Sequence, residues 1–353
     1  MINTTYLNFI NQHIYVGLDV HKKQWNVSVT AGNLLLSTMT RDPDVGSLVK
    51  YLRRNYPGAI YHCVYEAGFC GFWIHDQLKE AGIDCIVVNP ADIPTTNKEK
   101  DRKTDKVDSR KLSRCLSNGE LQGIQVLDNQ SYEDRSILRT REFLVKDQTR
   151  TKNRIKALLK FFNIETPETD THWSKKYMES LRRIDKLSET GKTSLTMYLN
   201  QLQSLRNNIS ETTKFIRSLS KKDPYSKQVE LLVTIPGISI LSAMILLTEI
   251  GNINEFNNIN KLCGFVGLIP SQYSTGDSNN LNHMTRRGKG ILKRIFIEAS
   301  WVAVRKDPGL LMNYKNLLKR VRASRAIITI ARKMIARVMF VLKNEEPYKF
   351  LAK

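Results

Sequence analysis

The first 120 residues alternate short apolar runs with amphipathic stretches. Five runs have the period-two alternation or the continuous apolar character of strands, and we predict strands at 13–20, 25–30, 34–40, 60–65 and 84–88. Three stretches repeat apolar residues at helical spacing, and we predict helices at 43–56, 71–81 and 104–116. A short turn at Ala31-Gly32-Asn33 joins the second and third strands, so the three opening strands are expected to pair antiparallel.

The predicted order βββαβαβα is that of the ribonuclease H fold, and it predicts an α/β domain of the ribonuclease H or RuvC class over residues 1–125. In that topology the first strand is central and the fourth strand pairs beside it. Polar residues at the ends of these two strands would then lie close together on the sheet.

The segment 126–225 has a different character, because it is polar, nearly free of Gly and rich in charge. Apolar residues recur at helical spacing from Leu138 to Phe162 and again from Leu181 to Leu219. We predict two long helices with an interruption near Pro167, arranged as a central coiled-coil arm. An ordinary helical bundle is the alternative.

The segment 226–353 is predicted to be a mainly α-helical C-terminal domain. It contains the sequence TIPGIS before an apolar helix, which is typical of a helix-hairpin-helix-like segment that aims backbone N–H groups at a phosphate. A loop rich in Gly, Ser, Thr and Asn follows in GLIPSQYSTGDSNNLN. The tail from Ser324 to Leu342 is predicted to be a basic amphipathic helix.

Four acidic residues fall at the ends of the predicted N-terminal elements. Asp19 lies in YVGLDVH, Glu66 ends the fourth strand in HCVYEAG, and Asp105 and Asp108 lie three residues apart in KTDKVDSR. Carboxylates that converge repel one another, and divalent cations offset that repulsion and support phosphodiester cleavage. Each acid taken alone also fits an ordinary surface role, and Asp101 competes with Asp105 if the helix starts earlier.

The chain carries 55 Lys and Arg against 34 Asp and Glu, for a net charge of +21. This excess favours a polyphosphate partner, although a generic basic protein is an equal alternative on charge alone. No long apolar run indicates a membrane span or signal peptide. The five cysteines are scattered without a CxxC pair, so we expect neither a zinc site nor disulfides, and a reduced, cytoplasmic setting.

Two basic groups accompany the predicted sites. One flanks the acidic pair and consists of Lys103, Lys106 and Arg110. The other follows the Gly-rich loop and consists of Arg286, Arg287, Lys289, Lys293 and Arg294. Both are predicted to contact nucleic-acid backbone, and a solvated helix face is the alternative for each. The histidines His21 and His283 are expected to have structural or solvent-facing roles.

These motifs resemble those of the DEDD-type insertion-sequence transposases of the family numbered one hundred and ten. The resemblance covers essentially the whole chain. It is carried in the N-terminal half by YVGLDVHKKQWNV and KTDKVDSRKL, and in the C-terminal half by TIPGIS, GLIPSQYSTG and RRGKGILKR.

The resemblance implies DNA transposition with Mg²⁺, or Mn²⁺ in its place, held by Asp19, Glu66, Asp105 and Asp108. It further implies a serine nucleophile that forms a covalent phosphoserine intermediate, and Ser274 matches that position. Thr275 and Ser271 stay open as alternatives. A structured guide RNA, a homo-oligomer (dimer or tetramer) formed through the arm, and a cytoplasmic, nucleoid-associated location are also implied.

Two other hypotheses compete with this one. A RuvC-like endonuclease would hydrolyse branched DNA with water and the four acids alone, but it would need neither the arm nor the STG segment. A nucleic-acid-binding protein with a degenerate site would not need the full acidic set. A covalent protein–DNA adduct separates transposition from hydrolysis.

Overall fold

A computed structural model describes residues 9–96, 104–166, 173–275, 278–284 and 287–350, and the side chains of residues 270–283 are outside that description. The chain folds as two compact units, Met1–Val126 and Leu127–Lys353. The predicted boundary at residue 225 therefore falls inside the second unit. No helix in the described ranges combines the length and apolar character that a bilayer crossing requires.

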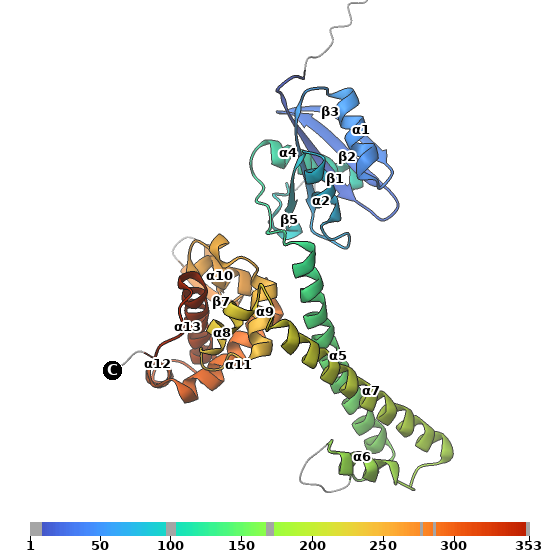
Figure 1. Ribbon diagram of the computed structural model, residues 1–353, viewed down its shortest axis with the longest axis vertical. Coiled ribbons are helices and arrows are strands. Elements are labelled where there is room, and N and C mark those ends of the chain that lie inside the picture. Colours follow the sequence, from blue (N-terminus) through green and yellow to red (C-terminus); the bar gives the residue numbers. More distant parts are fainter. Residues whose placement is uncertain (1–8, 97–103, 167–172, 276–277, 285–286, 351–353) are drawn as a thin grey trace, which may run out of the picture. The chain divides into compact units, whose positions relative to one another are not determined.

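The first unit is built on a five-stranded sheet with the strand order β3-β2-β1-β4-β5 (Figure 1). The strands are β1 (His13–Val20), β2 (Trp25–Ala31), β3 (Leu34–Arg41), β4 (Ile60–Glu66) and β5 (Asp84–Val88). Strand β1 pairs antiparallel with β2 and parallel with β4. The predictions of a central first strand and of the order βββαβαβα are confirmed.

Helices cover both faces of this sheet. They are α1 (Val45–Asn55), α2 (Trp73–Glu80) and α4 (Asp105–Ser117), with a 3₁₀ turn at Pro90–Asp92. Helices α1 and α2 pack on the face that presents Ile14, Val16 and Leu18, all fully buried. Helix α4 packs on the other face, where Leu112 contacts the cluster that contains Val64.

Gly17 allows α4 to lie directly against β1. A Cβ at this position would lie 2.2 Å from the carbonyl oxygen of Ser109, closer than real Cβ contacts come. Ser28, the Cα partner of Gly17 on β2, hydrogen-bonds through its hydroxyl to that of Ser109 at 2.8 Å. These contacts fix the first turn of α4 beside the C-terminal end of β1.

The second unit begins with two long helices, α5 (Asn129–Phe161) and α7 (Glu189–Leu219), which pack along each other (Figure 1). A short helix, α6 (Lys175–Arg182), joins them through a core that includes Ile155, Leu159, Tyr177 and Leu199. Two long helices were predicted. The stretch from Leu181 to Leu219 with apolar residues at helical spacing is divided between two helices, because α6 ends at Arg182 and α7 begins at Glu189.

The remaining helices enclose a larger core. They are α8 (Ser226–Val233), α9 (Ile240–Ile250), α10 (Ile259–Val266), α11 (Gly290–Lys306), α12 (Pro308–Leu318) and α13 (Ala323–Asn344), with a 3₁₀ turn at Ile253–Glu255. The prediction of a helical tail is confirmed by α13, whose apolar stripe is buried. Leu138 of α5 and Ile216 of α7 belong to the same core, so the two long helices are anchored in it.

The predicted Gly-rich loop is instead a two-stranded antiparallel sheet, β6 (Pro270–Thr275) with β7 (Ser278–Met284). The residues of this hairpin are polar, so the apolar alternation that reveals a strand in sequence is absent. Backbone hydrogen bonds form regardless of side-chain polarity, and sequence pattern alone therefore missed these strands.

Candidate metal and nuclease site

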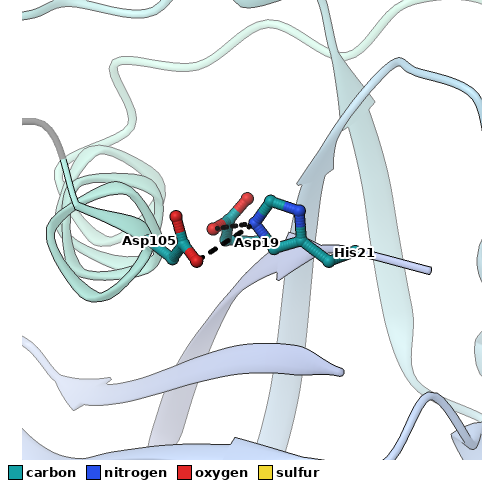
Figure 2. A group of neighbouring side chains, drawn as sticks. All are labelled: Asp19, His21 and Asp105. Carbon is teal, nitrogen blue, oxygen red and sulfur yellow. Dashed lines mark hydrogen bonds and ion pairs between the residues drawn. The ribbon is translucent and has the colours of Figure 1, made fainter. Parts of the chain in front are cut away.

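Two of the four predicted acids converge on a histidine in the first unit. Asp19 lies near the C-terminal end of β1 and Asp105 is the first residue of α4. The His21 Nε2 lies 3.0 Å from the Asp19 Oδ2 and 3.5 Å from the Asp105 Oδ2 (Figure 2). One donor atom from each of these residues lies within 4.8 Å of the others. His21, for which a structural or solvent-facing role was predicted, is 46% exposed and lies between the two carboxylates.

Asp108 lies one helical turn beyond Asp105 and is paired within its own helix. The Lys111 Nζ lies 2.8 Å from the Asp108 Oδ1, and the side chains are 9% and 20% exposed respectively. Asp108 is thus near the cluster along the helix, while its carboxylate is held by an ammonium group.

Glu66 reaches the same face of the sheet through strand register. Leu18 of β1 is the Cα partner of Tyr65 of β4, so Asp19 and Glu66 are the next residues on two adjacent parallel strands. Residues alternate between faces along a strand. Asp19 and Glu66 therefore share the face of Gly17 and Val64, which is the face that α4 covers.

The electrostatics of the cluster favour a bound cation. Burial raises the pKa of the Asp19 carboxyl, the nearby His21 opposes that shift, and the negative charges of Asp105 and Asp108 reinforce it. A cation among these carboxylates would remove the repulsion that disfavours their ionised forms.

The donor set fits a hard divalent ion. Carboxylate oxygens are the preferred ligands of Mg²⁺, and a mixture of carboxylate and imidazole also suits Mn²⁺. Asp19, Asp105 and His21 are close enough to share one ion, and Asp108 and Glu66 border the same face. The four predicted acids are thus compatible with metal binding, and His21 is an addition that the structure suggests.

Asn26 is a buried polar residue beside Asp19 that was not predicted as part of the site. It is the Cα partner of Asp19 on β2, and only 3% of it is exposed. Its Oδ1 accepts a hydrogen bond from the Thr40 hydroxyl at 3.0 Å, but among the described residues its Nδ2 has no partner. The signal was present in Trp25–Thr30, where Asn26, Ser28 and Thr30 alternate with apolar residues and so define a buried polar face.

The described basic residues differ in their surroundings. Arg110 is exposed, and its Nε donates to the Thr38 hydroxyl at 3.0 Å. The Arg294 Nη2 lies 2.6 Å from the Glu142 Oε2. Lys106 and Arg287 are exposed, and Lys293 is half-buried. Two of the predicted residues, Lys103 and Arg286, lie outside the described residues.

Lys289 forms an ion pair with the buried Glu249. Its Nζ lies 3.0 Å from the Oε2 of Glu249 and donates to the carbonyl oxygen of the same residue at 2.7 Å. Arg139 of α5 forks onto the Glu249 carboxylate at 2.7 and 3.0 Å. Burial raises the pKa of Glu249, but the hydrogen bonds from Arg139 and the charge of Lys289 outweigh it and hold the pKa below its usual value.

Ser274 lies on β6, where its Cα partner is Asn279 of β7. Thr275 is the last residue of the same strand and Ser271 is near its start. The backbone before the hairpin, at Gly267, lies directly against the backbone after it, at Gly288, since a Cβ at Gly288 would lie 2.6 Å from the Cα of Gly267. This close backbone contact holds the two ends of the hairpin segment together.

Comparison with known proteins matches both halves of the chain. Residues 16–164 match a DEDD-type IS110 model described as a transposase, and residues 229–315 match a model described as the transposase IS116/IS110/IS902 family. The transposase for insertion sequence element IS1533 of Leptospira borgpetersenii is 27% identical over 257 residues, 70% of this chain and 73% of that protein.

Two further relatives extend this similarity. A putative transposase, y4rJ, of Sinorhizobium fredii is 25% identical over 359 residues, covering 91% of this chain and 90% of its own. The transposase for insertion sequence element IS1111A of Coxiella burnetii is 24% identical over 259 residues, 71% of this chain and 69% of that protein.

Proposed function

The chain belongs to the IS110-type transposases, since family models match it over both 16–164 and 229–315, and on that premise we propose that it excises and inserts its own insertion sequence by cutting and rejoining DNA. The observation that carries the proposal is the convergence of Asp19, His21 and Asp105 on one face of the central sheet. A cluster of this kind beside a polyanionic substrate suits phosphodiester chemistry.

We propose that Asp19, Glu66, Asp105 and Asp108 hold Mg²⁺ or Mn²⁺, with His21 as an additional ligand. Such an ion, when bound, polarises a phosphate and stabilises the oxygens that attack and leave. The protein's own part is to keep the carboxylates converged, which the Gly17 contact with α4 supports. The Lys111 ammonium group holds the Asp108 carboxylate in place and balances part of the negative charge.

Ser274 is the proposed nucleophile. Its Oγ would attack a backbone phosphorus, so that a serine–phosphorus ester bond forms as the bond to one deoxyribose oxygen breaks. The proton that the serine hydroxyl loses is balanced by the proton that the leaving oxygen takes up. Attack by a deoxyribose hydroxyl on the phosphoserine would reverse the step and release the serine. Because an ester replaces an ester, the strand is rejoined without ATP.

The partners of this reaction are also proposals. The +21 charge supports binding of element-end and target DNA and of a structured guide RNA. The paired helices α5 and α7 offer a long surface for a dimer or tetramer. Of the predicted basic residues, Arg110, Arg287 and Lys293 are the described ones for which a phosphate contact is proposed.

An adduct-trapping experiment tests this function. Labelled element-end DNA is incubated with the protein, RNA transcribed from the flanking region and Mg²⁺, then run on a denaturing gel. We expect a slow, protease-sensitive band that Ser274→Ala abolishes and that Ser271→Ala and Thr275→Ala retain. Cleaved strands without an adduct would instead identify a hydrolytic RuvC-like endonuclease.

A further inference from the structure

Asn26 of β2 carries a buried hydrogen-bond donor next to the carboxylate cluster. Only 3% of the residue is exposed, and among the described residues its Nδ2 meets no hydrogen-bond acceptor. A buried donor that has given up its hydrogen bond to water and gained none in return costs free energy, so such groups are rare in folded proteins. An unsatisfied amide at this place therefore calls for a role that offsets its cost.

Asn26 lies on the same face of the sheet as Asp19. The two residues are Cα partners on the antiparallel strands β2 and β1. Residues directly opposite each other on such strands have Cβ atoms about 4.5–5.5 Å apart. Ser28, two residues along β2, hydrogen-bonds to Ser109 of α4 at 2.8 Å, which identifies this face as the one that α4 covers. Asn26 is thus a lateral neighbour of Asp19 on the α4 side of the sheet.

The contact with β3 orients the Asn26 amide. The Thr40 hydroxyl donates to the Asn26 Oδ1 at 3.0 Å, and Thr40 is the Cα partner of Asn26 on β3. Because β2 lies between β3 and β1, an amide oxygen that faces β3 turns the amide nitrogen toward the side of Asp19. The reverse orientation would bring the amide oxygen toward a carboxylate, and the two would repel each other.

His21 donates a hydrogen bond to Asp19 in this structure. Its Nε2 lies 3.0 Å from the Asp19 Oδ2, and an ionised carboxylate only accepts, so this nitrogen carries the hydrogen (Figure 2). A ring nitrogen must lose its hydrogen before it can ligate a cation. If His21 ligates a cation through Nε2, it can no longer donate to Asp19. Carboxylates that ligate metals are themselves held by hydrogen bonds, so Asp19 then needs another donor.

We propose that Asn26 is a positioning residue of the cation site, and that its Nδ2 donates to the Asp19 carboxylate when Asp19 and His21 bind a divalent cation. The amide N–H takes the place of the imidazole N–H, so Asp19 keeps a hydrogen bond and its orientation. Asn26 acts through Asp19 and is not itself a ligand. The inference rests on the proposed function, because it takes Asp19 and His21 as ligands of Mg²⁺ or Mn²⁺.

This role gives Asn26 opposite effects in two states of the protein. Without a cation the amide nitrogen is unsatisfied, so an apolar side chain of similar shape should leave the protein as stable as before or make it more stable. With a cation, loss of the donor should weaken binding about 10- to 100-fold, as is typical for residues that hold a metal ligand. An asparagine with a purely structural role would instead lower stability when replaced and leave cation affinity unchanged.

The test uses two variants of the full chain, Asn26→Leu and Asn26→Ala. Leucine keeps the branched shape of asparagine with methyl groups in place of the amide nitrogen and oxygen, and alanine removes the donor without added bulk. Because Thr40 is exposed, its hydroxyl can bond to water in both variants. Thr151→Val is the matched control, since the Thr151 Oγ1 is also buried without a partner in the described part of the chain but belongs to α5 of the second unit.

Urea unfolding in EDTA measures the stability of the cation-free protein, and isothermal titration calorimetry with Mn²⁺ measures the affinity. Neither measurement contains DNA, so neither depends on cleavage. We expect both Asn26 variants to bind Mn²⁺ about 10- to 100-fold more weakly than wild type. The urea midpoint of Asn26→Leu should equal or exceed that of wild type. Thr151→Val should keep the wild-type affinity for Mn²⁺.

Wild-type affinity for Mn²⁺ in either Asn26 variant would overturn this inference and leave the proposed function standing. A lower urea midpoint in both Asn26 variants would also overturn it, because the amide would then be satisfied in the cation-free protein. A wild type that binds no Mn²⁺ would overturn the proposed cation site and this inference with it. Circular dichroism checks the fold of each variant, and Asn26→Ala carries the test if Asn26→Leu does not fold.

Discussion

The packing of Gly17 under α4 gives the sharpest prediction for the acidic cluster. In Gly17→Ala, the new Cβ would lie 2.2 Å from the Ser109 carbonyl oxygen, 2.5 Å from the Ser113 nitrogen and 2.9 Å from the Leu112 Cβ. Two of these atoms belong to the helix backbone and cannot rotate away, so α4 must retreat by about 1 Å. The displacement carries Asp105 away from Asp19, which stays on β1.

The expected cost follows from this overpacking. Inserting a methyl group into a well-packed interior destabilises by about 1–3 kcal/mol, which corresponds to a fall in Tm of roughly 4–12 °C for a unit of this size. A misplacement of about 1 Å at a reacting centre lowers activity about 100-fold. We therefore expect a loss of metal-dependent DNA cleavage much larger than the fraction of protein unfolded at the assay temperature.

Calorimetry and a cleavage assay with labelled element-end DNA measure the two effects. Gly46→Ala on α1 is the matched control, because its Cβ would come no closer than 3.4 Å to the Asp44 side chain and would stabilise the helix slightly. If Gly17→Ala matches both Gly46→Ala and the wild type in Tm and cleavage rate, the contact of α4 with β1 does not position the site.

Three further predictions concern other contacts. His21→Ala should weaken Mn²⁺ binding about tenfold or more in isothermal titration calorimetry, and an unchanged affinity would exclude His21 as a ligand. Glu249→Gln should destabilise the second unit by about 3 kcal/mol in urea at pH 7, because it leaves Lys289 and Arg139 without their buried partner. In the wild type, the stability that this ionised carboxylate contributes should be present above about pH 4.5 and be lost as pH falls through the lowered folded pKa of Glu249. If the variant and the wild type unfold with the same dependence on acid pH, the assignment is contradicted. Tyr225→Phe should cost about 1–2 kcal/mol, since the Tyr225 hydroxyl donates to the Asp134 carboxylate at 2.8 Å in a buried site, and no change in the urea midpoint would refute it.

The elements of the first unit could be predicted from sequence because their apolar periodicity reflects burial directly. In the strand His13–Val20 the fully buried Ile14, Val16 and Leu18 are spaced two residues apart, and every predicted strand and helix of this unit begins and ends within two residues of its observed bounds. Periodicity reports which side chains share a face, and in this sheet it also reports register, because a one-residue slip would turn Ile14 and Leu18 away from α1 and α2 and toward α4.

The site was less predictable, because its geometry depends on contacts between distant segments. The acids were recognised from their positions at strand and helix ends, but the bridging role of His21 depends on how close α4 approaches β1, which Gly17 controls. Lys289 was predicted as a phosphate ligand from its basic neighbours, and its pairing with Glu249 joins residues 40 apart. The hairpin that carries Ser274 was missed because polar strands lack an apolar alternation.

The most direct test of the proposed function is metal-dependent cleavage by variants of the acidic cluster. Labelled element-end DNA is incubated with the guide RNA and either Mg²⁺ or EDTA, using wild type, Asp19→Asn, and Asp42→Asn as a matched substitution at an exposed acid of the same unit. The account predicts that wild type and Asp42→Asn cleave the DNA in Mg²⁺ and not in EDTA. It predicts that Asp19→Asn does not cleave the DNA in either condition. Cleavage by Asp19→Asn at the wild-type rate would contradict it.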